Sequence, residues 1–193
     1  MCFFMWTARI CLWITLLLGA GGWFDALMKG PRKIAVLSAL AVVCGLSFVP
    51  TVREPIVRVC AAPCAFALLC ALLCPTEHPL GAASAAVLGG IVGWKLLDTF
   101  PLFAEPGLLI ALPTLLFAAL YARDKNAAAL AVAASPFVML LFRMAGDWML
   151  FNSAVLELGN ADALAAQAMG LLLLLACGAF VKRREVRRVH AAA

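Results

Sequence analysis

The sequence predicts an all-α polytopic transmembrane helix bundle, most simply one with seven spans. Hydrophobic residues make up 66% of the 193 residues and charged residues only 13%, whereas a soluble domain is roughly half apolar and a quarter charged. The apolar runs lack the alternation of barrel strands, so the spans are expected to be helices. A span needs about 20 apolar residues, which leaves room for six or seven.

Seven apolar stretches are expected to cross the membrane, and prolines or glycines mark most of their ends. Their ranges are 10–28, 34–52, 59–74, 80–100, 107–121, 127–151 and 164–181. The fifth is the shortest, and omitting it gives a six-span alternative that breaks the alternation of charge between loops. Pro63, Pro113 and Pro136 fall inside stretches and are expected to kink them. We expect one transmembrane domain over residues 1–181 and a basic cytoplasmic tail over 182–193.

The basic residues favour one orientation, because lysine and arginine concentrate on the cytoplasmic side of membrane proteins. Ten of them lie in alternate loops and in the tail, namely Lys29, Arg32, Lys33, Arg123, Lys125, Lys182, Arg183, Arg184, Arg187 and Arg188. Only Arg53 and Arg58 lie in the opposite loops between spans. This bias places the C-terminus in the cytoplasm and, with seven spans, the N-terminus outside, although Arg9 then lies on the outer side. Those in the 29–33 turn and in the tail are expected to fix the topology and to contact lipid head groups.

Four charged residues inside the spans are the strongest candidates for a functional site, because a charge in lipid is costly unless it is paired or hydrated. Lys95 and Asp98 are three apart, and Arg143 and Asp147 are four apart, so each pair shares a helix face. One interpretation is an outward-facing polar pocket or ion-pair network between the fourth and sixth stretches, which we call spans 4 and 6. The other is two self-neutralised pairs that reach the head groups and tie two helices together.

The cysteines and one further charge pair are interpreted as structural. Cys60, Cys64, Cys70 and Cys74 share one face of the third stretch, over a length of roughly 20 Å. That length and the lack of a C-x-x-C spacing argue against metal ligation, so we expect packing, no metal and no cofactor. Asp25 and Lys29 are spaced for an interfacial ion pair.

Small residues recur every four positions in the fourth stretch, at Gly81, Ala85, Gly89 and Gly93. Such spacing lets two helices approach closely. We therefore expect these residues to pack helices together, with span 4 either central in the bundle or a dimerisation face.

No sequence motif indicates catalysis, so we expect no enzyme. The chain has no P-loop, nucleophile elbow, zinc-protease motif or dinucleotide fingerprint. Its two histidines, His78 and His190, lie in a turn and in the tail, which disfavours a Ser-His-Asp site. The net charge of +5 is concentrated in short loops and the tail, so it does not indicate a nucleic-acid surface.

Three features resemble the YphA family of small multi-spanning membrane proteins from Gram-positive bacteria. They are Trp13 and Trp23 in the first stretch, the basic turn at 29–33, and the segment Gly146-Asp147-Trp148. The likeness is one of length, span number and rough placement over most of the chain. It implies a multi-span helical fold and brings no activity, cofactor or site residue with it.

These observations favour a non-enzymatic partner subunit or scaffold in the bacterial cytoplasmic (inner) membrane. Its partners would be the lipid bilayer and another membrane protein or a second copy of the chain, and no nucleic acid. The alternative function is a small transporter or substrate-binding membrane subunit. In that case Lys95, Asp98, Arg143 and Asp147 would form its outward-facing polar site.

Overall fold

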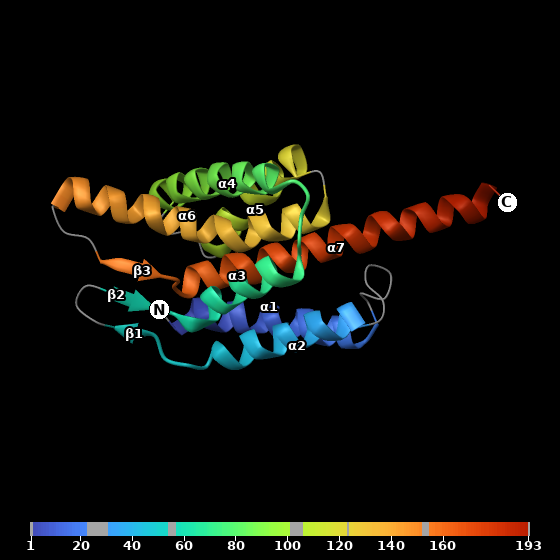
Figure 1. Cartoon of the computed structure of the whole chain (residues 1–193), viewed down its shortest axis with the longest axis horizontal. Helices are drawn as coiled ribbons and strands as arrows, with labels where there is room; N and C mark the ends of the chain where they lie inside the picture. Colours follow the sequence, from blue (N-terminus) through green and yellow to red (C-terminus); the bar gives the residue numbers. More distant parts are fainter. Residues whose placement is uncertain are drawn as a thin grey trace.

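Figure 1 shows the computed structural model, which describes residues 2–22, 31–53, 57–100, 106–122, 124–151 and 155–192. Within these ranges, the side chains of residues 2–5, 52–53, 106 and 179–192 are not described. The elements in order are α1 (Cys2–Ala20), α2 (Pro31–Leu46), β1 (Val52–Arg53), β2 (Val57–Val59), α3 (Ala61–Leu73), α4 (Pro79–Thr99), α5 (Pro106–Tyr121), α6 (Lys125–Phe151), β3 (Leu156–Leu158) and α7 (Ala161–Ala192).

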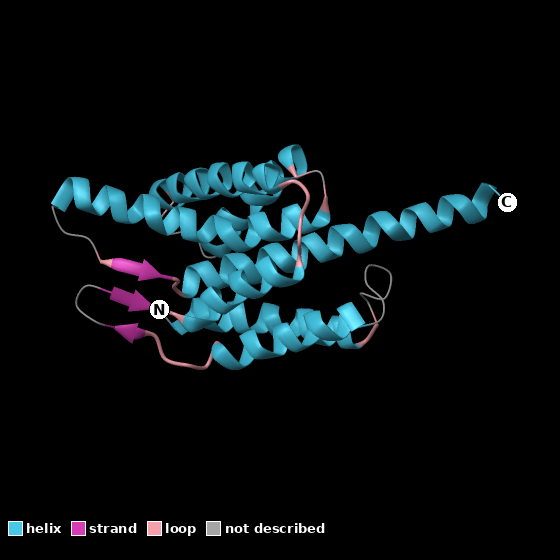
Figure 2. Ribbon diagram, viewed as in Figure 1, coloured by secondary structure: helices cyan, strands magenta, loops and turns pink. Residues whose placement is uncertain are grey.

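Helices dominate the part of the chain that the structure describes, as Figure 2 shows, and the prediction of a helical bundle is confirmed. Three segments are long and apolar enough to cross a membrane, namely Pro79–Thr99, Lys125–Phe151 and Ala161–Gly178. Three shorter apolar helices accompany them, over Trp6–Ala20, Ala61–Leu73 and Gly107–Tyr121. The structure thus shows a chain compatible with a membrane protein.

The first helix lies nearer the N-terminus than the predicted stretch at 10–28. It begins at Cys2 and ends at Ala20, and Gly22 follows with a φ of 84°. That backbone conformation suits glycine and commonly ends a helix, which is why the apolar run does not continue as α1. Asp25 and Lys29 lie outside the described residues.

A small sheet replaces the predicted helical ends near Val52 and Val59. β1 pairs antiparallel with β2, and β2 pairs in parallel with β3, with Arg58 opposite Glu157. Valines favour extended backbone, and Pro50 and Pro55 disfavour a helix through this connection. The prediction that residues 34–52 form one helical span was therefore wrong at its C-terminal end.

Capping side chains explain where the last two helices begin. Asp124 accepts a hydrogen bond from the Ala127 N–H at the start of α6. Asn160 accepts one of 2.8 Å from the Ala163 N–H at the start of α7. Both are the side-chain caps that satisfy an otherwise unpaired donor in a first helical turn. α7 then continues without a break to Ala192, so the predicted tail at 182–193 prolongs the last helix beyond the bundle (Figure 1).

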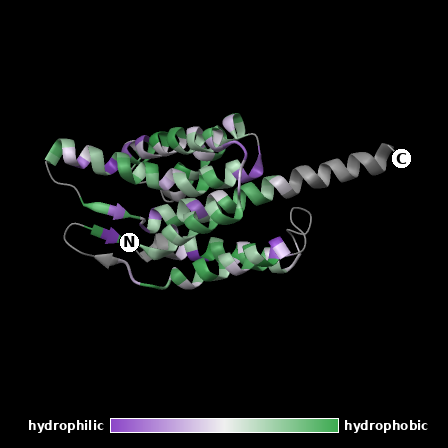
Figure 3. Cartoon of the chain, viewed as in Figure 1, coloured by the Kyte–Doolittle hydropathy of each residue, from purple (hydrophilic) through white to green (hydrophobic). Residues whose placement is uncertain are grey.

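α7, and not α4, occupies the centre of the bundle. It packs against α1, α3, α5 and α6, whereas α4 packs mainly against α5 and α6. Large exposed apolar side chains occur on each of α1 to α6, for example Leu17, Leu72 and Leu120, but on none of the described part of α7. Figure 3 shows that hydrophobic residues are spread over the helices of the bundle, and the large exposed ones among the described helices lie on α1 to α6.

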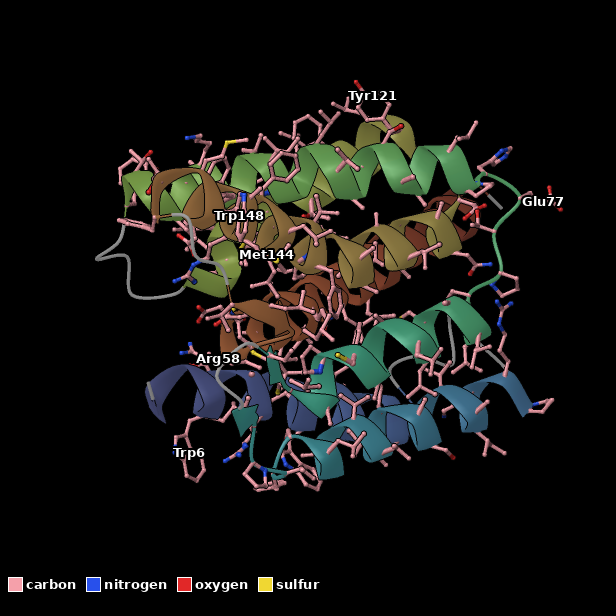
Figure 4. All side chains as sticks on the ribbon, turned by 60° about the vertical axis from the view of Figure 1, so that its left-hand side comes forward. Trp6, Arg58, Glu77, Tyr121, Met144 and Trp148 are labelled. Atoms are coloured by element: carbon pink, nitrogen blue, oxygen red, sulfur yellow. The ribbon has the colours of Figure 1, made fainter. Side chains whose placement is uncertain are left out.

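The bundle has two unlike ends, which we name by their contents. The sheet end holds the three strands, the ends of α4 and α6, and the start of α7. The basic end holds the starts of α2, α4 and α6. Figure 4 shows Trp6, Arg58 and Trp148 toward the sheet end and Glu77 at the basic end.

Glycines of α4 bring three helices into close contact. A Cβ placed on Gly89 would lie 2.7 Å from the Thr114 Cα of α5, and one on Gly90 would lie 2.7 Å from the Ser135 carbonyl oxygen of α6. The Thr114 hydroxyl oxygen lies 2.8 Å from the Ser135 hydroxyl oxygen, fully buried beside this contact. Close approach therefore depends on the absence of a side chain on α4.

Gln167 ties α7 to two neighbours. Its amide nitrogen donates to the carbonyl oxygens of Ala133 in α6, at 2.9 Å, and Pro63 in α3, at 3.3 Å. The side chain is completely buried, and its Oε1 has no hydrogen-bond partner among the described residues. Because both neighbours are acceptors, the nitrogen must face them, and a buried amide then links three helices.

Candidate functional site

The structure places the predicted charges of α4 on its surface at the sheet end. Lys95 and Asp98 approach to 4.0 Å, with side chains 60% and 69% exposed. The Lys95 ammonium also lies 4.2 Å from the ring centre of Trp94. A pair this exposed is screened by solvent wherever water or head groups reach it, so its contribution to stability is small.

Aromatic rings make the contact between α4 and α6 at this depth. Trp94 stacks on Phe142 with ring centres 6.0 Å apart. A Cβ placed on Gly146 would lie 3.6 Å from the Trp94 ring, so this glycine leaves room for the indole. Arg143 and Asp147 are exposed residues on the same stretch of α6. The four predicted charges therefore lie around an aromatic contact.

Arg143 and Asp147 do not form the ion pair that their spacing suggests. Among the ion pairs between described residues, none includes either side chain. Spacing within one helix therefore identified the ion pair of α4 but not one in α6.

A second polar cluster joins the sheet to the start of α7. Arg58 of β2 donates to Glu157 of β3 across the parallel pair at 3.3 Å. Asn160 donates to the other oxygen of Glu157, also at 3.3 Å, while its own oxygen caps α7. Cys64 of α3 lies 3.3 Å from the Leu158 carbonyl oxygen. These contacts join the sheet, α3 and the start of α7 at the sheet end.

A cavity of about 680 Å³ lies at the basic end, between α2, α3, α6 and α7. Its apolar walls are formed by Val36, Ala39, Leu40, Val43, Phe66, Leu69, Leu73, Ala129, Leu171, Leu174, Leu175 and Gly178. Its polar lining consists of Arg32, Lys125 and Asn126, together with the thiols of Cys70, Cys74 and Cys177. Cavities that hold small molecules have this size and this mainly apolar lining.

Hydrogen bonds join the ends of α2, α3 and α6 and the turn between α3 and α4 at the basic end of this cavity. Arg32 reaches the Leu73 carbonyl oxygen at 3.4 Å and the Asn126 amide oxygen at 3.5 Å. The Asn126 nitrogen donates to the Pro75 carbonyl oxygen at 2.7 Å, which turns its oxygen toward Arg32. Thr76 donates to Asp124 at 2.9 Å. The bond from the Ala127 N–H, with help from Thr76, holds the pKa of the Asp124 carboxyl below its usual value.

The four cysteines of the third stretch are divided between two environments. Cys60 and Cys64 lie near the sheet end, and Cys70 and Cys74 line the cavity. Within the described ranges, no group of three or more histidine, cysteine, aspartate or glutamate side chains is arranged to hold a metal ion.

Analysis of the sequence singled out individual residues of the cavity, but it did not predict the cavity. Arg32 was predicted to fix the topology, and Lys125 was counted with the same basic set. Gly81, Ala85, Gly89 and Gly93 lie where α4 meets its neighbours. Lys29 and the side chains of Lys182, Arg183, Arg184, Arg187 and Arg188 lie outside what the structure describes. A cavity shared by four helices has no local signal in the sequence.

Comparison with known proteins returned no matching family model, no matching curated protein and no matching solved structure. The resemblance to the YphA family therefore stays a prediction.

Proposed function

We propose that this chain is a seven-span protein of the bacterial cytoplasmic membrane, with its N-terminus outside and its C-terminus inside. The exposed apolar side chains on α1 to α6 support this arrangement, since soluble monomers rarely expose such extended apolar surface. The basic residues at one end supply the orientation. α3 is roughly 20 Å long and too short to cross alone, and β2 extends its path toward the outer surface.

We further propose that the protein is a non-enzymatic subunit that binds a small molecule with a large apolar part. The single observation that carries this proposal is the 680 Å³ cavity between α2, α3, α6 and α7. The starts of α2 and α6 contribute its charged and amide groups, and α2, α3, α6 and α7 all contribute to its apolar walls. A partner membrane protein or a second copy of the chain would take up what is bound.

The test is mass spectrometry of gently purified full-length protein, covering both proteins and small molecules. Wild type should retain an apolar molecule. Ala129→Phe, which places a ring in the cavity, should lose it, while Ala119→Phe on the exposed face of α5 should retain it. Equal retention by both variants, or no retained molecule in wild type, would contradict the proposal. A stoichiometric partner protein would identify the complex.

A second candidate is transport through an outward-facing polar site between α4 and α6. The Lys95–Asp98 ion pair beside the Trp94–Phe142 contact favours it. Asp98→Asn with Asp147→Asn should abolish uptake or binding and leave the fold intact. Loss of the fold instead would assign these charges a structural role.

A further inference from the structure

We propose that the cavity at the basic end binds an anionic lipid, with its phosphate head group held by Arg32 and Lys125 and its apolar chain lying between α2, α3, α6 and α7. This inference rests on the proposed binding function and names the class of ligand. From the sequence, Arg32 was expected to fix the topology and to contact lipid head groups, and Lys125 was counted in the set that favours one orientation, but no cavity for a lipid chain was predicted.

The polar groups of the cavity are gathered at one end of it. Arg32 is the second residue of α2, and Lys125 and Asn126 are the first two residues of α6. Among the described residues that line the cavity, none is acidic. The N-terminus of α2 adds partial positive charge at the same place, whereas the Asp124 carboxylate caps that of α6. The mouth is therefore suited to an anion, and the deeper walls are suited to hydrocarbon.

Arg32 is held in a position to receive a phosphate. Its two hydrogen bonds are long, at 3.4 and 3.5 Å, and both go to neutral oxygens. A guanidinium has five donors in a planar fork and binds phosphate in a bidentate manner. The Asn126 amide, fixed by the Pro75 carbonyl, keeps one edge of this fork in place.

The depth of the cavity matches one leaflet of a bilayer. Along α2 its lining runs from Arg32 to Val43, a distance of roughly 16 Å at the helical rise. Half of a hydrocarbon core is about 15 Å thick. A free phosphate would occupy only the mouth and leave the apolar walls without a partner. A lipid chain fills both, and the basic loops face the leaflet in which anionic lipids are recognised by such residues.

Native mass spectrometry of the purified full-length protein tests the inference. Three probes are titrated separately: phosphatidylglycerol, phosphatidylcholine with the same chains, and chain-free glycerol 3-phosphate. We expect tight binding of phosphatidylglycerol alone. Arg32→Gln with Lys125→Gln should weaken it about thirtyfold. The control, Lys95→Gln with Arg143→Gln, removes the same charge from exposed positions at the sheet end, away from the cavity, and should leave the affinity unchanged.

The outcomes separate this inference from the proposed function. If phosphatidylcholine binds as well as phosphatidylglycerol, and Ala129→Phe still displaces both, the cavity binds an apolar molecule and the head-group site is wrong. Binding of glycerol 3-phosphate at the same affinity would assign the site to a free anion. If Ala129→Phe displaces nothing, the proposed function fails as well. An equal loss in the Lys95 and Arg143 control would show that net charge alone attracts the lipid, and it would overturn the inference.

Discussion

Two regions of the bundle use apolar helices in opposite ways. Where α4 meets α5 and α6, Gly89 and Gly90 leave no space for even a methyl group. Where α2, α3, α6 and α7 meet, residues such as Leu40, Phe66 and Leu171 surround a cavity of about 680 Å³. α6 belongs to both regions, so one helix packs closely on one face and borders an opening on another.

The difference shows that side-chain size at facing positions, and not overall hydrophobicity, decides how closely two helices approach each other. Glycine and alanine let two backbones come into contact, and the stabilisation comes from many van der Waals contacts at short distance. Leucine and phenylalanine hold backbones apart and fill space only where they interdigitate. Both kinds of contact occur along α6, which packs closely against α4 and also borders the cavity.

The largest expected effect comes from putting a side chain into the close region. Gly89→Leu should lower the free energy of unfolding by about 3 kcal/mol, because its Cβ alone would overlap Thr114. The control is Gly45→Leu in α2, where a Cβ would meet nothing within 4 Å and the change should cost under about 1 kcal/mol. Unfolding in detergent and SDS, followed by circular dichroism, measures both. Equal losses would show that the two environments do not differ.

Two alanines on α6 compare the regions within one helix. Ala131→Phe should lower the free energy of unfolding by about 2 kcal/mol, because Ala131 is completely buried against its neighbours. Ala129→Phe should change it by less than about 1 kcal/mol, because the ring can enter the cavity. The same unfolding experiment measures both variants. A larger loss at position 129 would mean that the cavity is closed in the native membrane protein.

Gln167 tests what holds the two regions to α7. Gln167→Leu removes both interhelical hydrogen bonds and also the unpaired Oε1, so we expect a net loss of about 1 kcal/mol. Thr15→Val is the matched change, since the buried Thr15 hydroxyl bonds the Cys11 carbonyl within its own helix. It should cost less than Gln167→Leu in thermal unfolding. The reverse order would argue against the amide as the link between helices.

The smallest effect concerns pH at the basic end. The pKa of Asp124 is lower in the folded protein than its usual value of about 3.9, chiefly because of the hydrogen bond from the Ala127 N–H. The stability it contributes is therefore present above pH 4 and is lost as the pH falls through the lowered pKa. Asp124→Asn keeps a cap and cannot titrate. Its melting temperature should fall less steeply below pH 4 than that of wild type.

The sequence was sufficient for most of the helices, because long apolar runs and proline breaks are local signals. The predicted stretches at 80–100, 107–121 and 127–151 differ from α4, α5 and α6 by only a residue or two at each end. The sheet was not predicted, since β2 and β3 come from distant parts of the chain and are only three residues long. The central position of α7 was also missed, because composition does not say which apolar helix is surrounded.

The candidate sites also divide into those that a local sequence signal predicted and those that depend on how helices pack. Spacing within one helix identified the Lys95–Asp98 pair, which forms. The same reasoning suggested a pair between Arg143 and Asp147, which is not among the ion pairs of the described residues. The cavity draws on α2, α3, α6 and α7, so its prediction would require knowing how these helices pack.

The position of α7 has a consequence for synthesis of the protein. α1 packs chiefly against α7, and β2 pairs with β3, so the first three helices are made long before these partners leave the ribosome. Contacts between such distant parts of a chain form slowly. In the seven-span arrangement proposed above, the early helices would be shielded by lipid or by the insertion machinery until α7 arrives. A chain that stops before Ala161 would lack the element on which its N-terminal half assembles and would present itself to the membrane proteases as unfinished.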